Sequence, residues 1–475
     1  MNNLFFSKIL RSDNIHFVGI GGVGMGALAE ICIKLGYKIS GSDIKENLIT
    51  KKLSVLGAKI YNQHCANNII ESTIIVVSSA IKEDNLEIIY AKKLNIPVVK
   101  RAEFLSELMR FKYGIIVSGT HGKTTTTSII SYIYKEAKLF PTYLYGGRLN
   151  NSDDYGNLGN SKYWISEADE SDNSFLFFRP IISVVTNIEK DHLESYQGNF
   201  KKLKESFIKF LHNIPFYGYS VLCLDDIEIK KIIPLINKKI VTYGFNRNSD
   251  FCITKFFQSN KKIIFIVYIK HQKRYLKFVS NLLGKHNALN ITAAITIAIK
   301  EGIKYNIILN SIKKFPGINR RFDFINKYDL SNLNNKKGTI TIVDDYGHHP
   351  TELKLTIKSV KKIWNKRRLI MIFQPHKYTR TKYLYNYFVK VLSTVDILLI
   401  MEIYSAGENP IYKINSKNLC QSIMALKRSH VIFIPNEKFL FKKLELLLKN
   451  NDILLLQGAG TIENIFKKLT SKLLL

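Results

Sequence analysis

Short apolar runs alternate with helix-length amphipathic segments through the first part of the chain. The runs cover residues 16–19, 38–42, 74–78 and 97–100, and each has the length of a buried strand. Strands that alternate with helices in this way pair in parallel, because each helix carries the chain back to the start of the next strand. The pattern therefore predicts a β-α-β domain with a parallel sheet over residues 1–110.

The same alternation returns twice further along the chain. From Tyr113 the predicted elements are strands at residues 163–167, 181–186 and 220–224, consecutive strands through 240–280, and a helix at 287–300. From Arg320 the predicted strands are residues 339–344, 368–373, 397–401, 431–434 and 452–457. We predict a second α/β domain with additional β-strands at 111–317 and a third, doubly wound domain at 318–475.

The length of the chain agrees with three domains, since 475 residues exceed what one core supports and domains average about 150 residues. The apolar run near residue 5 is too short for a signal peptide, and no apolar run elsewhere reaches the length of about 18 residues that a membrane helix needs. We therefore expect a cytoplasmic protein without membrane insertion. The five cysteines form no C-x-x-C pair, and we interpret them as small buried side chains. They are Cys32, Cys65, Cys223, Cys252 and Cys420.

The formal net charge is +32, which ordinarily points to a nucleic-acid partner. The lysines, however, are spread over every segment and form no single basic arm. We interpret the charge as solvated surface, with no nucleic-acid partner and with a modest attraction for anionic substrates.

The strongest chemical signal is a glycine-rich turn between an apolar strand and a helix, at residues 114–127. Free backbone N–H groups and the positive end of the helix dipole surround an anion in such a turn. Lys123 would reach the terminal phosphates of a nucleoside triphosphate, and the Thr124 hydroxyl would ligate magnesium. The turn is a short variant, because Val117 stands where the usual phosphate loop has its first glycine. The residues predicted to form this cradle are Gly119, Thr120, His121, Gly122, Lys123, Thr124 and Thr125.

A second glycine-rich turn follows the first predicted strand. Gly19, Gly21 and Gly24 fit G-x-G-x-x-G, with Gly22 between them. Asp43 ends the next strand, at about the 20-residue offset of an acid that binds ribose. Alone, this pattern indicates a dinucleotide and hence a dehydrogenase. Two nucleotide-type loops in one chain argue against that class, because a simple dehydrogenase has no use for the second loop.

Acidic and histidine residues follow two further strands of the central domain. The carboxylates in residues 167–172 suit magnesium or its waters opposite a triphosphate, and an ordinary acidic surface turn is the alternative. Spacing leaves open whether Glu167, Glu170 or both face the metal. His192 offers an imidazole to a second divalent ion, or serves only the structure.

A polar cluster begins the last predicted helix of the central domain. His286 and Asn290 are four residues apart and share one helix face, so they could clamp the edge of a base. A helix N-cap is the alternative interpretation of this cluster.

Two motifs in the third domain follow predicted strands. Residues 344–352 contain Asp345 and His348 at the start of a helix; their two histidines are adjacent rather than four apart, which disfavours a zinc site. Residues 374–381 contain His376 and offer Arg380 as a clamp for phosphate or carboxylate. Both motifs lie beyond the carboxyl ends of strands, where doubly wound sheets bind ligands.

With these motifs together, the chain resembles the ATP-dependent Mur ligases of peptidoglycan assembly over nearly its whole length. The motifs that carry the resemblance occur in the family's order: GIGGVGMGALAE, GTHGKTTTT, EADESDNSF, TNIEKDHLESY, LGKHNALN, RRFDF, VDDYGHHPTE, FQPHKYTRT and LLLQGAGTI. The chain departs from the family at Lys377, where the family usually has arginine. A lysine ammonium carries a single compact charge and lacks the planar, bidentate geometry of a guanidinium.

The resemblance implies a role for each domain. The N-terminal Rossmann-like domain would bind a UDP sugar rather than NAD, through Gly19, Gly21, Gly22, Gly24 and Asp43. The central domain would bind ATP, with Thr124, Glu167 and His192 around Mg²⁺ and with His286, Asn290 and Arg321 at the nucleotide. The C-terminal domain would bind the amino acid, with Asp345 and His376 as substrate residues and with His348 and Arg380 joining Lys123 in catalysis.

The reaction that the resemblance implies is the ATP-dependent ligation of L-alanine to the lactyl carboxylate of UDP-N-acetylmuramate, through an acyl phosphate. The partners would be these two substrates, and the protein would act as a monomer or weak homodimer. Within the family, an enzyme that adds a whole tripeptide is the alternative. Outside it, a dehydrogenase would need NAD, and a nucleic-acid-stimulated ATPase would need DNA or RNA.

Overall fold

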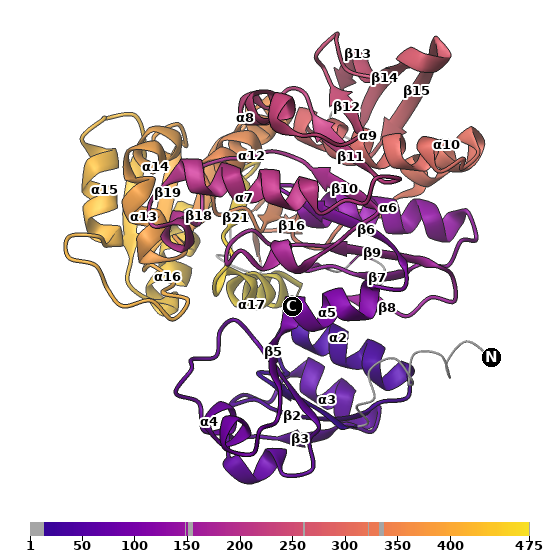
Figure 1. Ribbon diagram of the computed structural model, residues 1–475. Helices are drawn as coiled ribbons and strands as arrows, with labels where there is room; N and C mark the ends of the chain where they lie inside the picture. The colour runs from indigo at the N-terminus through magenta and orange to yellow at the C-terminus, as the bar shows by residue number, and fades with distance from the viewer. Residues whose placement is uncertain are drawn as a thin grey trace. The chain divides into compact units, whose positions relative to one another are not determined.

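The computed structural model describes residues 14–147, 149–150, 155–259, 262–321, 323–331 and 337–474, and contains three sheets (Figure 1). One compact unit extends to Pro316, apart from residues 257–264 and 280–288, which belong with Gly317–Leu475 to the other unit. The division into three domains at residues 110 and 317 stays a prediction. Among the described residues, no helix combines the length and the apolar character needed to cross a bilayer.

The first sheet is parallel throughout and has the strand order β3-β2-β1-β4-β5. Its region contains β1 (Asn14–Val18), α2 (Val23–Lys34), β2 (Lys38–Ser42), α3 (Leu48–Val55), β3 (Lys59–Tyr61), β4 (Ile74–Val77), α4 (Leu86–Lys93), β5 (Val98–Lys100) and α5 (Arg101–Met109). All four predicted strands are present. The pattern missed β3, because three residues with one exposed lysine give no apolar run. The turns after β1 and β5 both lie at the carboxyl edge of this sheet.

The second sheet has ten strands in the order β15-β14-β13-β12-β11-β10-β6-β9-β7-β8. Its strands are β6 (Tyr113–Ser118), β7 (Thr142–Leu144), β8 (Gly156–Asn157), β9 (Tyr163–Glu167), β10 (Ile182–Val185), β11 (Tyr219–Cys223), β12 (Ile240–Gly244), β13 (Phe251–Gln258), β14 (Ile263–Ile269) and β15 (Arg274–Ser280). Its helices are α6 (Lys123–Glu136), α7 (Phe200–His212), α8 (Ile227–Ile232), α9 (Lys285–Lys300) and α10 (Tyr305–Lys314). Because β6 pairs in parallel with β9 and β10, the motifs that follow these three strands meet at one edge of the sheet.

The third sheet has the order β16-β17-β21-β18-β19-β20, in which only the pairing of β16 with β17 is antiparallel. Its strands are β16 (Asp323–Asp329), β17 (Thr339–Asp345), β18 (Leu369–Phe373), β19 (Ile397–Met401), β20 (His430–Ile434) and β21 (Ile453–Gln457). Its helices are α12 (Pro350–Ile363), α13 (Tyr378–Tyr383), α14 (Tyr385–Leu392), α15 (Ser416–Met424), α16 (Glu437–Leu447) and α17 (Ile462–Leu474).

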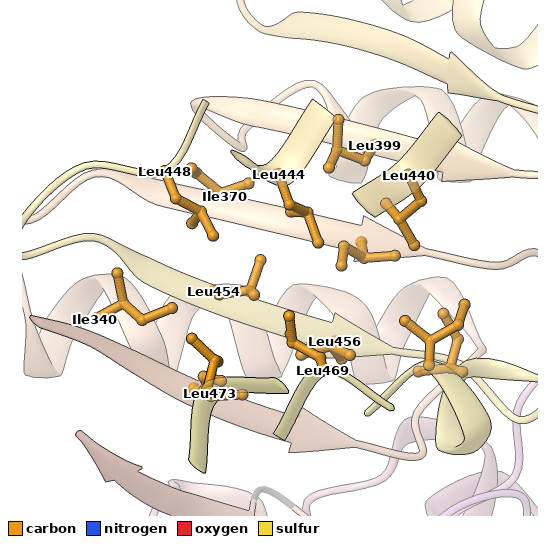
Figure 2. Packing of buried hydrophobic residues seen from close by; sticks show 14 of the residues in the cluster. Ile340, Ile370, Leu399, Leu440, Leu444, Leu448, Leu454, Leu456, Leu469 and Leu473 are labelled. Atoms are coloured by element: carbon orange, nitrogen blue, oxygen red, sulfur yellow. The ribbon is translucent and has the colours of Figure 1, made fainter. Parts of the chain in front are cut away.

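Alternate residues of the third sheet's strands feed two separate cores. Ile370 of β18 joins Leu444 of α16 and Leu469 of α17 on one face (Figure 2). Its neighbour Met371 joins residues of α12, α14 and α15, among them Leu353, on the other. Helices that bury both faces of a mostly parallel sheet make this region doubly wound, as predicted.

The cysteines are all free, and four of the five are buried as predicted. Cys32, Cys223, Cys252 and Cys420 are buried, and Cys65 is partly buried. Burial raises the pKa of the Cys223 thiol to about 12, and it raises that of Cys420 to the same value. These thiols are protonated at neutral pH and therefore serve as packing groups.

Candidate functional site

The central glycine-rich turn joins β6 to α6 and is shaped by two glycines with positive φ. Gly119 has φ +123° and Gly122 has φ +82°. A Cβ on Gly119 would lie 2.3 Å from Thr186 Oγ1, and one on Gly122 would lie 2.5 Å from Asn290 Oδ1. Asn290 of α9 thus lies directly against the turn. No side chain caps α6, so the N–H groups of its first turn are available to an acceptor from outside the helix.

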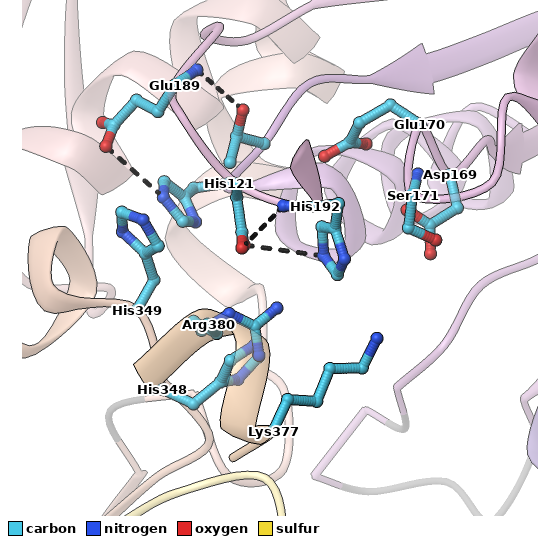
Figure 3. Close-up of polar contacts among 12 residues, drawn as sticks. His121, Asp169, Glu170, Ser171, Glu189, His192, His348, His349, Lys377 and Arg380 are labelled. Carbon is cyan, nitrogen blue, oxygen red and sulfur yellow. Dashed lines mark hydrogen bonds and ion pairs between the residues drawn. The ribbon is translucent and has the colours of Figure 1, made fainter. Parts of the chain in front are cut away.

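The segment after β10 holds this turn in place. The backbone N–H of His121 donates to Asn187 Oδ1 at 2.9 Å, and Asn187 Nδ2 donates back to the His121 carbonyl at 2.9 Å. Glu189 N donates to Thr120 Oγ1, and His121 Nε2 lies 3.7 Å from Glu189 Oε2 (Figure 3). The sequence interpretation used this segment only for His192 and missed Asn187 and Glu189. Their position directly after a buried strand was the available signal.

Lys123 begins α6 and is paired with two acids that follow β9. Its Nζ lies 2.7 Å from Glu170 Oε2 and 3.6 Å from Asp169 Oδ1. Burial alone would lower the pKa of Lys123, but Glu170, Asp169 and Glu167 together raise it above its usual value. Burial raises the pKa of Glu170, although Lys123 opposes that shift. The lysine is therefore charged and close to carboxylates that an incoming triphosphate would replace as its partners.

Thr124 and Glu167 are brought together, as predicted for metal ligands. The Thr124 hydroxyl donates to Glu167 Oε2 at 2.7 Å, and the Gly146 N–H donates to Glu167 Oε1 at 2.7 Å. Glu170, the other carboxylate left open by the sequence, contacts Lys123 instead. This geometry favours Glu167 as the carboxylate that would share a cation with Thr124. Two oxygen donors at one point suit Mg²⁺, which prefers oxygen ligands.

His192 lies beside the same acidic group. It has φ +52°, and its ring contacts Asp191 at 3.5 Å and Glu194 at 3.7 Å. Burial would raise the pKa of Asp169, but Lys123 and His192 together lower it, which places His192 near the carboxylates around Lys123. Figure 3 shows His192 with Asp169 and Glu170 in this region. His286 lies in the first turn of α9, one turn before Asn290.

The N-terminal glycine-rich turn joins β1 to α2 and is fixed by the end of β2. Gly19 has φ +81°, and the N–H groups of Gly19 and Ile20 both donate to the Ser42 carbonyl. Gly21 N donates to Asp43 Oδ2 at 2.9 Å, and Lys45 N donates to Asp43 Oδ1 at 3.1 Å. Both carboxylate oxygens of Asp43 thus accept from backbone N–H groups of nearby loops. Gly22 is the N-cap of α2, and no side chain caps that helix.

In the C-terminal sheet, three of the predicted residues lie together. The ring centroids of His348 and His376 are 5.4 Å apart, and Arg380 Nη1 lies 3.3 Å from His376 Nδ1. Arg380 is buried although it belongs to the six-residue helix α13. Tyr404 stacks on His376 at 5.4 Å, and Glu408 accepts from Thr379 N at 3.0 Å. Neither Tyr404 nor Glu408 is predicted from the sequence, because the loop after β19 carries no recognisable spacing.

Asp345 and Arg321 each have an internal partner in this region. Asp345 Oδ1 accepts from Gly347 N at 2.9 Å and from Gln457 Nε2 at 2.8 Å, so this carboxylate joins the ends of β17 and β21. Arg321 lies 3.7 Å from Glu352, and its guanidinium covers the Tyr346 ring at 5.0 Å.

The central sheet carries a glycine-rich turn of the phosphate-binding type, the kind of site that nucleotide-dependent enzymes use. Sequence profiles described as "Mur ligase family, catalytic domain", "Mur ligase middle domain" and "Mur ligase, glutamate ligase domain" match residues 14–113, 117–298 and 329–460. The chain belongs to the Mur ligase family.

Individual relatives resemble the chain over nearly its full length. It is 50% identical to the UDP-N-acetylmuramate–L-alanine ligase of Baumannia cicadellinicola, over 97% of this chain and 94% of that protein. It is 49% identical to the enzyme of the same name from Blochmanniella floridana, over 99% and 97%. Among solved structures, the UDP-N-acetylmuramate–alanine ligase of Thermotoga maritima superimposes with a TM-score of 0.79 at 28% identity, over 97% of this chain and 98% of that one.

Proposed function

We propose that the protein ligates L-alanine to the lactyl carboxylate of UDP-N-acetylmuramate with ATP, giving UDP-N-acetylmuramoyl-L-alanine, ADP and phosphate. This reaction makes a precursor of peptidoglycan. One observation carries the proposal: identity of 50% over 97% of the chain with a protein named for this reaction. A protein that depends on ATP and on a nucleotide sugar is expected in the cytoplasm, and we propose that it acts there as a monomer or weak homodimer, without nucleic acid.

The chemistry explains why ATP is needed. A carboxylate is a poor electrophile, because neither of its oxygens is a good leaving group. A lactyl carboxylate oxygen attacks the γ-phosphorus, the bond from that phosphorus to the bridging oxygen breaks, and ADP leaves an acyl phosphate behind. The amine nitrogen of L-alanine then attacks the acyl carbon, phosphate departs with the electrons of the broken C–O bond, and the amine gives up a proton.

Residues of the central turn would carry the first step. Lys123 would exchange Glu170 for the γ-phosphoryl oxygens, whose charge it stabilises in the transition state. Gly119 through Thr125 would hold the phosphates by backbone N–H groups, and Asn290 lies beside Gly122, where the nucleotide enters. Thr124 and Glu167 would hold Mg²⁺, which neutralises phosphate charge when bound. We also assign His192 to the metal, and His286 and Arg321 to the nucleotide.

Residues of the C-terminal sheet would carry the second step. His348 Nδ1 lies 3.2 Å from the Tyr346 carbonyl, which can only accept, so the proton of this imidazole is assigned to Nδ1. We assign its Nε2 as the nitrogen that would take the proton of the attacking amine. Arg380 would pair with the L-alanine carboxylate, held in position by His376. Asp345 would support the same subsite.

Phosphate release tests the proposal directly. The purified protein receives ATP and magnesium with UDP-N-acetylmuramate and L-alanine, first separately and then together. We expect release only when both substrates are present, and loss of it in Lys123→Ala. The matched control is Lys135→Ala, which removes an exposed lysine from the far end of the same helix.

Release that is indifferent to the sugar would contradict the proposal. Replacement of L-alanine by the free tripeptide separates the two activities within the family. If the tripeptide supports release and L-alanine does not, the protein is a peptide ligase instead.

A further inference from the structure

A cavity separate from both glycine-rich turns opens at the amino edge of the central sheet. It has a volume of about 730 Å³ and is bounded by α5, by the start of β6 and by η2 (Ser174–Phe177). Gly114 and Ile116 of β6 line it. The phosphate turn follows the other end of the same strand, and the chain from Gly114 to Gly119 spans about 16 Å when extended. The cavity therefore does not belong to the nucleotide site.

The mouth and floor of the cavity suit an aromatic ligand. Gly114 leaves the floor without a side chain, and a Cβ there would lie 3.2 Å from Met109 Cε and 3.8 Å from Pro180 Cα. A glycine inside a strand weakens the strand, and such a glycine often marks a point of close approach. Phe177 and Tyr217 also line the cavity and are 41% and 64% exposed. Aromatic side chains in contact with water at the mouth of a cavity favour a ligand with apolar rings.

The charges that line the cavity favour an anion. Arg179 is exposed, and within the described ranges it has no hydrogen-bond or ion-pair partner. Lys112 is partly buried, its Nζ donates to a backbone carbonyl at 2.8 Å, and burial lowers the pKa of this lysine because its charge has lost hydration. Arg110 is paired with Glu107 at 3.1 Å, which leaves Glu103 as the other acid of the lining. An anion beside Arg179 and Lys112 would stabilise both charges.

The wall formed by η2 is hydrogen-bonded to the acidic segment beside the phosphate turn. Phe175 N donates to the Asp169 carbonyl at 3.2 Å, and Asn173 N donates to the next carbonyl, that of Glu170, at the same distance. The side chains of Asp169 and Glu170 lie 3.6 and 2.7 Å from Lys123 Nζ. A ligand that packs against η2 therefore stabilises the arrangement in which Lys123 is paired with carboxylates. An incoming triphosphate has to break that pairing, so the two ligands oppose each other.

We propose that this cavity is an effector site for an aromatic anion, and that its occupancy weakens nucleotide binding at the Gly119–Thr125 turn. The anion would pair with Arg179 and Lys112. Its rings would lie against Phe177 and Tyr217. The inference goes beyond the proposed function, because no residue that lines the cavity belongs to either glycine-rich turn.

Binding is measured with 1-anilinonaphthalene-8-sulfonate, a fluorescent aromatic sulfonate, on the full chain. We expect saturable binding whose affinity falls by about tenfold in Arg179→Ala, the effect of losing one charge-assisted contact. In Tyr217→Ala we expect a loss of about threefold, because part of the apolar contact disappears. Arg247→Ala is the matched control, since it removes an exposed arginine far from the cavity in sequence, and it should leave the affinity unchanged.

The second measurement is the coupling to the nucleotide. A saturating concentration of the sulfonate should raise the Kd of a nonhydrolysable ATP analogue with magnesium by about five- to tenfold and then reach a plateau. The analogue should weaken binding of the sulfonate by the same factor, because coupling between two sites is reciprocal. Direct competition for the phosphate turn would instead raise the Kd without limit. In Arg179→Ala, the analogue alone should bind as it does to the wild-type protein.

Three outcomes would overturn the inference while leaving the proposed function intact. The first is a sulfonate affinity that is unchanged in both Arg179→Ala and Tyr217→Ala. The second is a Kd of the ATP analogue that either does not change or rises without a plateau. The third is self-association that disappears in Tyr217→Ala when the sulfonate does not bind at all, which would assign this face to a second copy of the chain.

Failure of the proposed function gives a different result. A wild-type protein that does not bind the ATP analogue would contradict that function. The sulfonate affinities of the two variants need no nucleotide, so they would still support or overturn the cavity as a binding site.

Discussion

Two glycine-rich turns leave parallel strands in this chain, one after β1 and one after β6, and each leads into a helix whose first turn no side chain caps. The turn after β6 carries its own cation, Lys123, which is paired with Glu170 at 2.7 Å. The turn after β1 contains no basic residue, and the guanidinium of Arg101 on α5 lies beside its Gly24. In both turns the backbone is arranged to receive an anion. The side chains around the two turns differ, and we expect them to determine which anion binds and which chemistry follows.

Two buried carboxylates extend the contrast. Glu87 of α4 is fully buried and accepts from Ser42 Oγ at 2.6 Å and Asn68 Nδ2 at 2.7 Å. Burial by itself would raise the pKa of Glu87, but hydrogen bonds from His16, Ser42 and Asn68 lower it to about 2. Glu170 keeps one buried oxygen without a partner in the described structure, and burial raises its pKa. The hydrogen bonds of the fold therefore satisfy Glu87. Glu170 is left with one unsatisfied oxygen, and we expect it to change partners when Lys123 binds a triphosphate.

The largest effect is expected where the central turn holds its metal. Glu167→Gln removes the carboxylate beside Thr124, and we expect kcat to fall by about 100- to 1000-fold, with a higher magnesium requirement. The measurement is phosphate release as a function of magnesium concentration. Glu136→Gln, at the exposed end of α6, is the control. A larger change in the magnesium requirement in Glu170→Gln would reassign the metal ligand.

Replacing one glycine of each turn by alanine tests whether the two turns bind different substrates. Gly122→Ala would place a Cβ 2.5 Å from Asn290 Oδ1, and Gly21→Ala would place one 2.8 Å from Asp43 Oδ2. We expect the first to raise the KM for ATP and the second the KM for UDP-N-acetylmuramate, each by about tenfold. Gly302→Ala, which has φ +78° and no atom within 4 Å, controls for backbone strain alone. If either variant raises both KM values equally, the two turns do not bind separate substrates.

Glu87→Gln tests the stabilising side of the comparison. We expect the free energy of unfolding to fall by about 1–3 kcal/mol at pH 7, because buried hydrogen bonds to a charged group are lost. The folded-state pKa of Glu87, about 2, is below its ordinary value, so its stabilisation is complete above about pH 5 and disappears as the pH falls toward 2. Urea denaturation should therefore show the two proteins converging below pH 5. A constant difference down to pH 3 would contradict this explanation.

The smallest effect is expected from the dispersed positive charge. Lys201→Ala and Lys262→Ala remove exposed lysines outside both turns, and each KM should change by less than about twofold at physiological salt. The measurement is substrate kinetics at two salt concentrations. A large, salt-dependent rise in the KM for either nucleotide would mean that the net charge, rather than the two turns, attracts the substrates.

The sequence predicted most of the architecture from local pattern. All four N-terminal strands, the consecutive strands β12 to β15 and the helix α9 are present near their predicted positions. It missed the seven-residue strand β16. It also missed β3 and the short strands β7 and β8, because two or three residues carry no periodic signal. It also predicted that the carboxylates of residues 167–172 lie near the central turn, since parallel strands bring their carboxyl ends to one edge.

By itself the sequence determined the two phosphate-type turns, the alternation of strands and helices, and the family, because these depend on residues close together in the chain. Only the tertiary structure decided which carboxylate faces Thr124, which faces Lys123, and that Asp43 binds its own turn. It alone brought Arg101 to Gly24. The reason is physical: side-chain direction and burial depend on packing between segments far apart in sequence, and no local pattern encodes those contacts.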